Sequence, residues 1–149
     1  MVAELNQRFQ AEEDAAYFTM IFGMIDQTSG RMVLTQAGHP PPLHVHRDGQ
    51  VTTVGDGGSV VGLFVDADYE NIELGLHPGD RMVLYSDGIV ECTSPDGMLF
   101  SEERFIEFCS ATTSLPLPQM LQELQRHLES WRGSPIYEDD ISLLVIEKT

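Results

Sequence analysis

Turn signals divide the first hundred residues of this chain into short apolar segments. Glycine-containing turn sequences occur at residues 26–30, 47–49, 77–80 and 94–97. Short segments between such turns are typical of β-strands joined by hairpins. Helical spacing of apolar residues is confined to residues 1–14 and to a block after residue 100. This pattern predicts an α+β fold in which mainly antiparallel sheets pack against helices.

Residues 17–25 form the strongest strand candidate. They are β-branched and aromatic, and too apolar for a half-exposed position, which predicts a central strand. Further strands are predicted at residues 31–36, 43–46, 50–54, 72–76, 81–88, 89–93 and 141–146. We expect the last of these to close a sheet as another central strand.

Three helices are predicted. The first covers residues 1–14, with Val2, Leu5 and Phe9 on one face. Ser101 caps the second helix, which has an acidic first turn and carries Phe105, Ile106 and Phe108 inward. Pro118 begins the third helix. Its apolar stripe consists of Leu121, Leu124, Leu128 and Trp131.

The charge of the chain restricts its partners. Its 149 residues are enough for one domain with a hydrophobic core, so we treat residues 1–149 as a single predicted domain. The formal net charge is -16, because 8 Lys and Arg residues face 24 Asp and Glu residues. This balance argues against nucleic acid and against an anionic membrane as partners. A phosphorylated substrate would also be repelled, so phosphoryl chemistry here requires a bound cation.

The cysteine spacing and the lengths of the apolar runs indicate where in the cell the protein is expected. Cys92 and Cys109 are far apart and form no CxxC pattern, which indicates neither a zinc site nor a disulfide framework. No apolar run reaches the length of a membrane span, and no signal peptide pattern occurs. We therefore expect a cytoplasmic protein.

Two acidic residues stand at the ends of predicted strands. Asp87 ends the segment 81–88 together with Gly88, and Asp139 precedes the segment 141–146. Buried strands rarely carry a carboxylate at the rim without a partner, because an unpaired desolvated charge is costly. Carboxylates on two rigid strands can converge on one hard cation, which can activate water for attack on phosphate. Asp87 and Asp139 are the candidate metal ligands.

Simpler interpretations of these acidic residues stay open. Asp87 and Asp139 also fit ordinary turn and cap positions. Asp140 should point away from Asp139 if the segment is extended, so only one of the two should face the site. Glu91 is either an outer-sphere group or a solvated glutamate on a strand face.

The histidines and the glycine-rich segment are weaker candidates. His39 lies in a Gly- and Pro-rich loop without a nucleophile motif, which favours a structural turn over an acid–base role. His44 and His46 share one strand face and could bind a metal, but surface histidines are the favoured interpretation. Residues 55–58 lack the Lys and Ser/Thr of a P-loop, which argues against nucleotide binding.

Several segments occur in the order found in one protein family. They are Phe18-Thr19 with Asp26, AGHPPPL at 37–43, VGL at 61–63, PGD at 78–80, LYSDGIVE at 84–91 and DDIS at 139–142. In this order they resemble the PPM-type metal-dependent protein phosphatases, in the SpoIIE-like bacterial branch found at the output end of two-component response regulators. The resemblance covers nearly the whole chain.

The resemblance implies an antiparallel β-sandwich flanked by helices that holds Mn²⁺ or Mg²⁺ between carboxylates. It implies hydrolysis of phosphoserine or phosphothreonine by metal-activated water, without a phosphoenzyme. Asp87 and Asp139 match the later metal-ligating aspartates of the family, and His39 matches a structural loop. The implied substrate is a phosphorylated regulatory protein, of the anti-sigma-factor antagonist class, in a partner-switching pathway.

The chain departs from the family pattern at its front. Family domains begin with strands that carry Gly-Asp and Asp-x-x-Gly-His motifs, and neither motif occurs at the front of this chain. Glu12, Glu13 and Asp14 do not replace them. We expect an N-terminally truncated domain, with weak or no turnover by this chain alone and with sheet edges available for homodimer formation. The alternative is a non-catalytic module that binds partners with the same fold.

Overall fold

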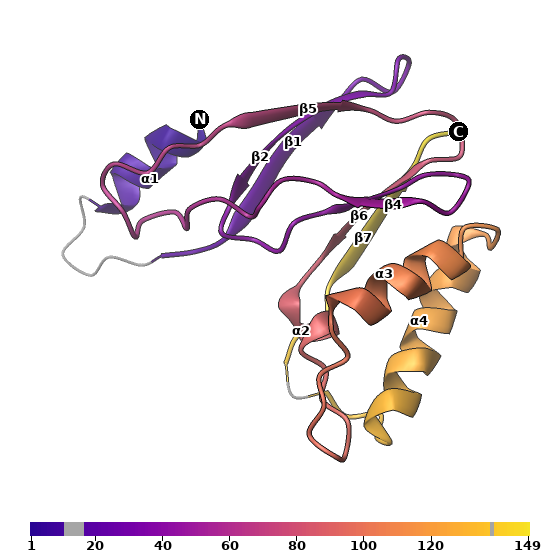
Figure 1. The fold of residues 1–149 in the computed structure, drawn as a ribbon. Helices are drawn as coiled ribbons and strands as arrows, with labels where there is room; N and C mark the ends of the chain where they lie inside the picture. Colours follow the sequence, from indigo (N-terminus) through magenta and orange to yellow (C-terminus); the bar gives the residue numbers. More distant parts are fainter. Residues whose placement is uncertain (11–16, 138) are drawn as a thin grey trace. The chain divides into compact units, whose positions relative to one another are not determined.

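The structure, a computed structural model, describes residues 1–10, 17–137 and 139–149 (Figure 1). The chain divides into two compact units. Unit 1 contains Met1–Pro41, Thr53–His77 and Lys148. Unit 2 contains Pro42–Thr52, Pro78–Glu147 and Thr149. We describe each unit by itself.

Unit 1 contains helix α1 (Val2–Gln10) and a three-stranded antiparallel sheet. The strands are β1 (Met20–Ile25), β2 (Arg31–Ala37) and β5 (Asn71–Gly75), in the order β1-β2-β5. The predicted hairpin between the first two strands is confirmed, and Met20 pairs with Ala37. In the turn, Asp26 Oδ1 accepts hydrogen bonds from the Thr28 and Ser29 amides (2.8 and 3.1 Å). These amides lower the pKa of the Asp26 carboxyl below its usual value.

The apolar face of α1 covers the core of unit 1. Val2 is buried together with Ala37 and Val61, and Leu5 and Phe9 pack against them. Helix α1 also buries a polar residue, Asn6. Its amide donates to the Phe64 carbonyl (2.9 Å) and accepts from the Gly62 amide (2.7 Å). Both the nitrogen and the oxygen of the Asn6 side-chain amide are therefore hydrogen-bonded, which offsets the cost of burying them.

Unit 2 contains a four-stranded antiparallel sheet and three helices. The strands, in spatial order, are β4 (Val51–Thr53), β3 (Leu43–Val45), β6 (Arg81–Tyr85) and β7 (Leu143–Glu147). The helices are α2 (Asp87–Val90), α3 (Glu102–Ala111) and α4 (Leu117–Arg132). The short loop 46–50 joins β3 to β4 as predicted, with the His46 amide donating to the Gln50 carbonyl (2.8 Å).

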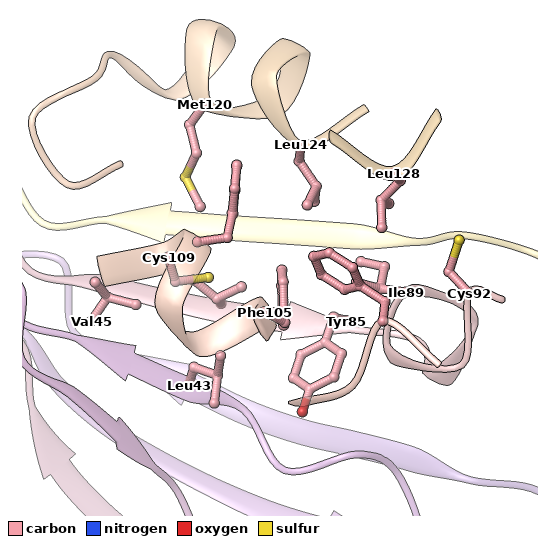
Figure 2. Packing of buried hydrophobic residues seen from close by; sticks show 13 residues of the cluster. Leu43, Val45, Tyr85, Ile89, Cys92, Phe105, Cys109, Met120, Leu124 and Leu128 are labelled. Carbon is pink, nitrogen blue, oxygen red and sulfur yellow. The ribbon is translucent and has the colours of Figure 1, made fainter. Parts of the chain in front are cut away.

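The core of unit 2 lies between its sheet and helices α3 and α4. Figure 2 shows Met120, Leu124 and Leu128 of α4 facing residues of the sheet and of α3. Phe105 of α3 is fully buried and makes an edge-to-face ring contact with Tyr85 of β6 (centroids 4.8 Å apart). Burying apolar surface at about 25 cal/mol per Å² makes this cluster the main stabilising element of the unit.

Arg81 is a buried cation at the start of β6. Its guanidinium donates to Glu147 Oε2 (2.7 Å) and to the carbonyls of Thr112 (3.1 Å) and Leu115 (2.6 Å). These partners belong to β7 and to the connection between α3 and α4. Arg81 therefore ties both segments to the first residue of β6.

Three strand predictions are wrong. Both strands expected to be central, β1 and β7, lie at edges of the described sheets. The apolar residues Met20 and Phe22 of β1 pack into the unit 1 core instead of serving a second neighbouring strand, and Met24 is exposed. Residues 89–93 form no strand, because Ile89 and Val90 belong to helix α2. A short apolar run does not distinguish a strand from a buried helical turn.

The helix predictions need smaller corrections. Helix α1 ends at Gln10, and the predicted continuation to residue 14 lies outside the described residues. Ser101 precedes α3, but its side chain makes no capping hydrogen bond and its φ is 72°. Leu121, predicted on the buried stripe of α4, is 43% exposed. Helix α4 starts with Pro118 in its first turn, as predicted.

No helix among the described residues is both long and apolar enough to span a membrane.

Stability is expected to fall as the pH rises from about 9 to about 12. Burial raises the pKa of the Cys109 thiol to about 12 from 9.0, with Arg81 opposing, and the pKa of Tyr85 to about 12 from 10.0. Both groups therefore stay protonated in the folded state while the unfolded state ionises, which favours unfolding in this pH range. We expect Cys109→Ala to flatten the pH dependence of the free energy of unfolding, measured by urea denaturation. An unchanged slope would contradict this assignment.

Candidate metal centre

Asp87 lies where β6 passes into helix α2. Strand β6 ends at Tyr85, Ser86 follows, and Asp87 is the first helical residue instead of the last residue of a strand. Its side chain is exposed, and Oδ1 accepts a hydrogen bond from the Gly88 amide (3.1 Å). The buried Gly88 and Ile89 anchor this turn against the unit 2 core.

Asp139 lies just before β7, at the same end of the sheet. Tyr85 pairs with Leu143, so the segments that extend beyond these residues run side by side. The Ser86 amide donates to the Ser142 carbonyl (3.0 Å). The Ser86 hydroxyl donates to the Asp140 carbonyl and accepts from the Ser142 amide, both at 2.9 Å. Ser86 thus fixes the segment that carries Asp139 beside the segment that carries Asp87.

Gly88 allows these two segments to approach each other closely. A Cβ atom at this position would lie 2.6 Å from the Asp140 carbonyl oxygen and 3.6 Å from Asp139 Cβ. The first distance is too short for any side chain. Gly88, the residue after Asp87, therefore lies directly against the segment that carries Asp139 and Asp140.

We expect Gly88→Ala to push Asp139 away from Asp87. The added methyl group must displace the backbone at Asp140, and overpacking of this kind costs about 1–3 kcal/mol. The predicted result is a lower Tm and weaker Mn²⁺ binding in a calorimetric titration. Gly75→Ala is the matched control, because a Cβ atom there meets nothing within 4 Å. Equal Mn²⁺ affinity in Gly88→Ala and the unsubstituted chain would contradict the role assigned to Gly88.

Asp139 lines a cavity of about 250 Å³ that is also lined by the positively charged Arg132. The cavity is lined by Gly88, Glu91, Cys92, Thr93, Leu99, Arg132, Tyr137 and Asp139. The Arg132 guanidinium lies 5.7 Å from the ring of Tyr137. Burial is the main cause that raises the Tyr137 pKa, so this phenol stays protonated at neutral pH. The cavity therefore combines carboxylate, guanidinium and phenol groups.

A second, larger cavity of about 610 Å³ lies beside α4. Its lining includes Leu121, Leu128 and Ile141, together with both Asp139 and Asp140. Asp139 and Asp140 therefore both line this cavity, and the expectation that only one of the two faces the metal site stays a prediction. The segment is bent at Asp139 instead of extended, so side chains do not alternate strictly there.

The remaining candidates fall into two groups. Glu91 lies at the C-terminal end of α2 and lines the smaller cavity with Asp139. His39 belongs to unit 1, where its Nδ1 lies 3.3 Å from Thr19 Oγ1. This contact ties the Gly- and Pro-rich loop to the residue before β1, as a structural loop residue would.

The acidic partner of His44 and His46 was not predicted from the sequence. His44 is buried, so the interpretation of it as a surface histidine is wrong. Asp80, assigned to a turn, lies against both His44 and His46. Among the described residues, these three side chains are the one group of at least three metal-ligating residues whose ligand atoms lie within 4.8 Å of one another. The alternation of the two histidines on one strand was the available signal.

The donors at Asp87 and Asp139 fit a hard divalent cation. Each carboxylate uses Oδ1 to accept a hydrogen bond from the next amide, at 3.1 Å for Asp87 and 2.8 Å for Asp139. A carboxylate has about four lone-pair sites, so these bonds orient each group and leave capacity for a metal. Oxygen donors of this kind suit Mg²⁺ and Mn²⁺.

Comparison with known proteins gives a family and a fold. The family described as Stage II sporulation protein E (SpoIIE) matches residues 1–149. Protein IcfG of Synechocystis sp. is 29% identical over 135 residues, which cover 89% of this chain and 21% of IcfG. Phosphoserine phosphatase RsbU of Bacillus subtilis is 26% identical over 154 residues, which cover 99% of this chain and 44% of RsbU.

One solved structure is similar to this chain in its fold. The SiaA-PP2C domain of Pseudomonas aeruginosa matches 98% of this chain and 58% of that chain, with a TM-score of 0.82 at 23% identity. The predicted α+β phosphatase fold is confirmed. The chain spans less than half the length of each of the two curated relatives described above.

Proposed function

Because this chain belongs to the SpoIIE family, we propose that it forms the metal-binding part of a protein serine/threonine phosphatase. The observation that carries the proposal is that the segments bearing Asp87 and Asp139 lie side by side at one end of the unit 2 sheet. The similarity to a phosphoserine phosphatase supports the reaction class.

In this proposal Asp87 and Asp139 hold Mn²⁺ or Mg²⁺. Such a cation lowers the pKa of water to generate a nucleophile and neutralises charge on phosphoryl oxygens. Ser86 and Gly88 keep the two carboxylates in register, as their hydrogen bonds and close packing indicate. The cation also offsets the repulsion between a phosphate and a chain with a net charge of -16.

Arg132 is the residue of this chain that we propose for contact with the substrate phosphate. It lines the cavity that contains Asp139, and a guanidinium is suited to bidentate binding of phosphate oxygens. The apolar side chains of the larger cavity, Leu121 and Ile141 among them, would contact residues beside the phosphorylated serine or threonine.

We propose as substrate a phosphorylated regulatory protein of the anti-sigma-factor antagonist class, in cytoplasmic partner-switching signalling. The family resemblance supports this class, and the acidic surface excludes substrates that need a basic docking face. Among the described residues, β1 is the edge strand of its sheet, and pairing of this edge with a second copy of the chain would give the homodimer that we propose.

Hydrolysis of a phosphoserine peptide, followed with and without Mn²⁺, tests the proposal. The assay should compare the chain printed above with a longer natural form, if the gene encodes one. We expect Mn²⁺-dependent phosphate release that disappears on chelation. Release that is independent of Mn²⁺ and Mg²⁺ in every form would contradict the proposal.

One observation favours a second candidate, a non-catalytic partner-binding module. In the part of the chain that the structure describes, Asp87 and Asp139 belong to no group of three metal-ligating side chains. Two carboxylates supply only part of a two-metal centre. A binding module predicts that Mn²⁺ leaves the Tm unchanged, whereas a bound cation raises it through mass action.

A further inference from the structure

Two imidazoles and a buried carboxylate meet at the end of unit 2 where β6 begins. His44 lies in β3, His46 follows that strand, and Asp80 immediately precedes β6. Leu43 and Val45, which alternate with the histidines, face the hydrophobic core. Side chains alternate along a strand, so His44 and His46 share its other face. Their rings lie 4.0 Å apart, centroid to centroid.

Asp80 is oriented toward both imidazoles. Its Oδ2 lies 3.0 Å from His44 Nε2 and 3.8 Å from His46 Nδ1. Its Oδ1 accepts a hydrogen bond from the Arg47 amide (3.1 Å), which fixes the rotation of the carboxylate. Asp80 is only 2% exposed, so this orientation is held within the fold. Ligands fixed before the metal arrives favour binding.

The distances match those of a tetrahedral zinc site. Zinc bonds to His nitrogen and Asp oxygen are about 2.0–2.2 Å long, which separates neighbouring ligand atoms by roughly 3.3–3.5 Å. The two measured separations, 3.0 and 3.8 Å, lie on either side of this value. All three ligand atoms lie within 4.8 Å of one another, so a small contraction completes the set.

The ligand atoms of His44, His46 and Asp80 favour a different metal from the one proposed for Asp87 and Asp139. Imidazole nitrogen suits zinc and neighbouring transition metals, whereas two carboxylates suit Mg²⁺ and Mn²⁺. The His46 side chain is 33% exposed, which gives an ion a path from solvent and leaves room for a water ligand. His44 and Asp80, at 10% and 3%, supply the buried side of the site.

We propose that His44, His46 and Asp80 form a Zn²⁺ site separate from the phosphatase centre. Asp80 and Asp87 are seven positions apart in the sequence, with all of β6 between them, and at about 3.3 Å per residue this places the two sites on the order of 20 Å apart. Zn²⁺ bound there joins β3 to the residue before β6. It therefore stabilises the strand whose opposite end leads to Asp87.

Calorimetric titration of the chain with ZnCl₂, without Mn²⁺, tests this site. We expect saturable binding of one ion to this site. His46→Gln and Asp80→Asn should each weaken that binding at least about tenfold, because even the loss of an outer-sphere partner costs about 10- to 100-fold in affinity. His39→Gln, which removes an imidazole from unit 1, should bind Zn²⁺ like the unsubstituted chain.

Two further measurements separate this proposal from the proposed function. Asp139→Asn should keep the zinc affinity, and His46→Gln should keep the increase in Tm that Mn²⁺ causes and a normal circular dichroism spectrum. The absence of saturable Zn²⁺ binding by the unsubstituted chain would overturn the proposal, whatever the variants do. Equal zinc affinity in folded His46→Gln and in the unsubstituted chain would also overturn it.

Discussion

Replacing Asp139 with asparagine is expected to lower kcat/KM for Mn²⁺-dependent phosphoserine hydrolysis by on the order of 100-fold or more. Substituting a residue that only contacts the ligands of a metal already costs about 10- to 100-fold, and Asp139 is assigned to the metal itself. The amide keeps the shape of the side chain but removes its charge. The increase in Tm that Mn²⁺ causes should shrink together with the activity, since both depend on the same bound ion.

The control for this variant is Asp96→Asn. Asp96 is an exposed acidic residue in the same unit, at a turn, and its substitution changes the net charge by the same amount. Asp96→Asn should keep both the activity and the Mn²⁺-dependent increase in Tm. If Asp139→Asn and Asp96→Asn behave alike, Asp139 is a turn residue and not a metal ligand.

Arg81→Met is expected to destabilise the protein by about 3–5 kcal/mol. Glu147 is 31% exposed, so the main cost comes from the carbonyls that lose their hydrogen-bond donor, at about 1–3 kcal/mol each. In the variant, Glu147 and the carbonyls of Thr112 and Leu115 lose the hydrogen bonds that the guanidinium donates to them. Urea denaturation followed by Trp131 fluorescence measures the effect, because Trp131 packs against the unit 2 core.

Arg126→Met provides the comparison within the same unit. Arg126 pairs with Glu123 on the surface of α4, where both side chains are well exposed (63% and 43%). Exposed pairs of this kind contribute about 0–1 kcal/mol. A destabilisation by Arg81→Met as small as that by Arg126→Met would show that the buried guanidinium does not hold β6, β7 and the α3–α4 connection together.

Local sequence chemistry predicted the hairpins but not the order of strands in a sheet. The turn at Asp26 is specified by its own side chain, which binds the next amides, so the β1–β2 hairpin was readable. The position of β1 at an edge depends on the pairing of β2 with β5, about 40 residues later in the chain. Apolar composition indicates that a strand is buried, but not which element buries it. The burial of β1 against α1 was therefore predicted as burial between two neighbouring strands.

The candidate sites show the same division between local and long-range information. A carboxylate at the end of each of two buried strands predicted that Asp87 and Asp139 would meet, and the strand register brings them to one end of the sheet. The contact of His44 with Asp80 depends on the pairing of β3 with β6. Nothing local to the sequence near either residue specifies that register. Gly88 was predicted at the end of a strand, but the approach of Asp140 to it could be seen only in the fold.

Anomalous X-ray diffraction from crystals soaked in Mn²⁺ would show whether both carboxylates bind one ion. We expect an anomalous peak within bonding distance of carboxylate oxygens from both Asp87 and Asp139, at the end of β6. A well-occupied Mn²⁺ peak bound elsewhere on the chain, with these two carboxylates free of metal, would contradict it.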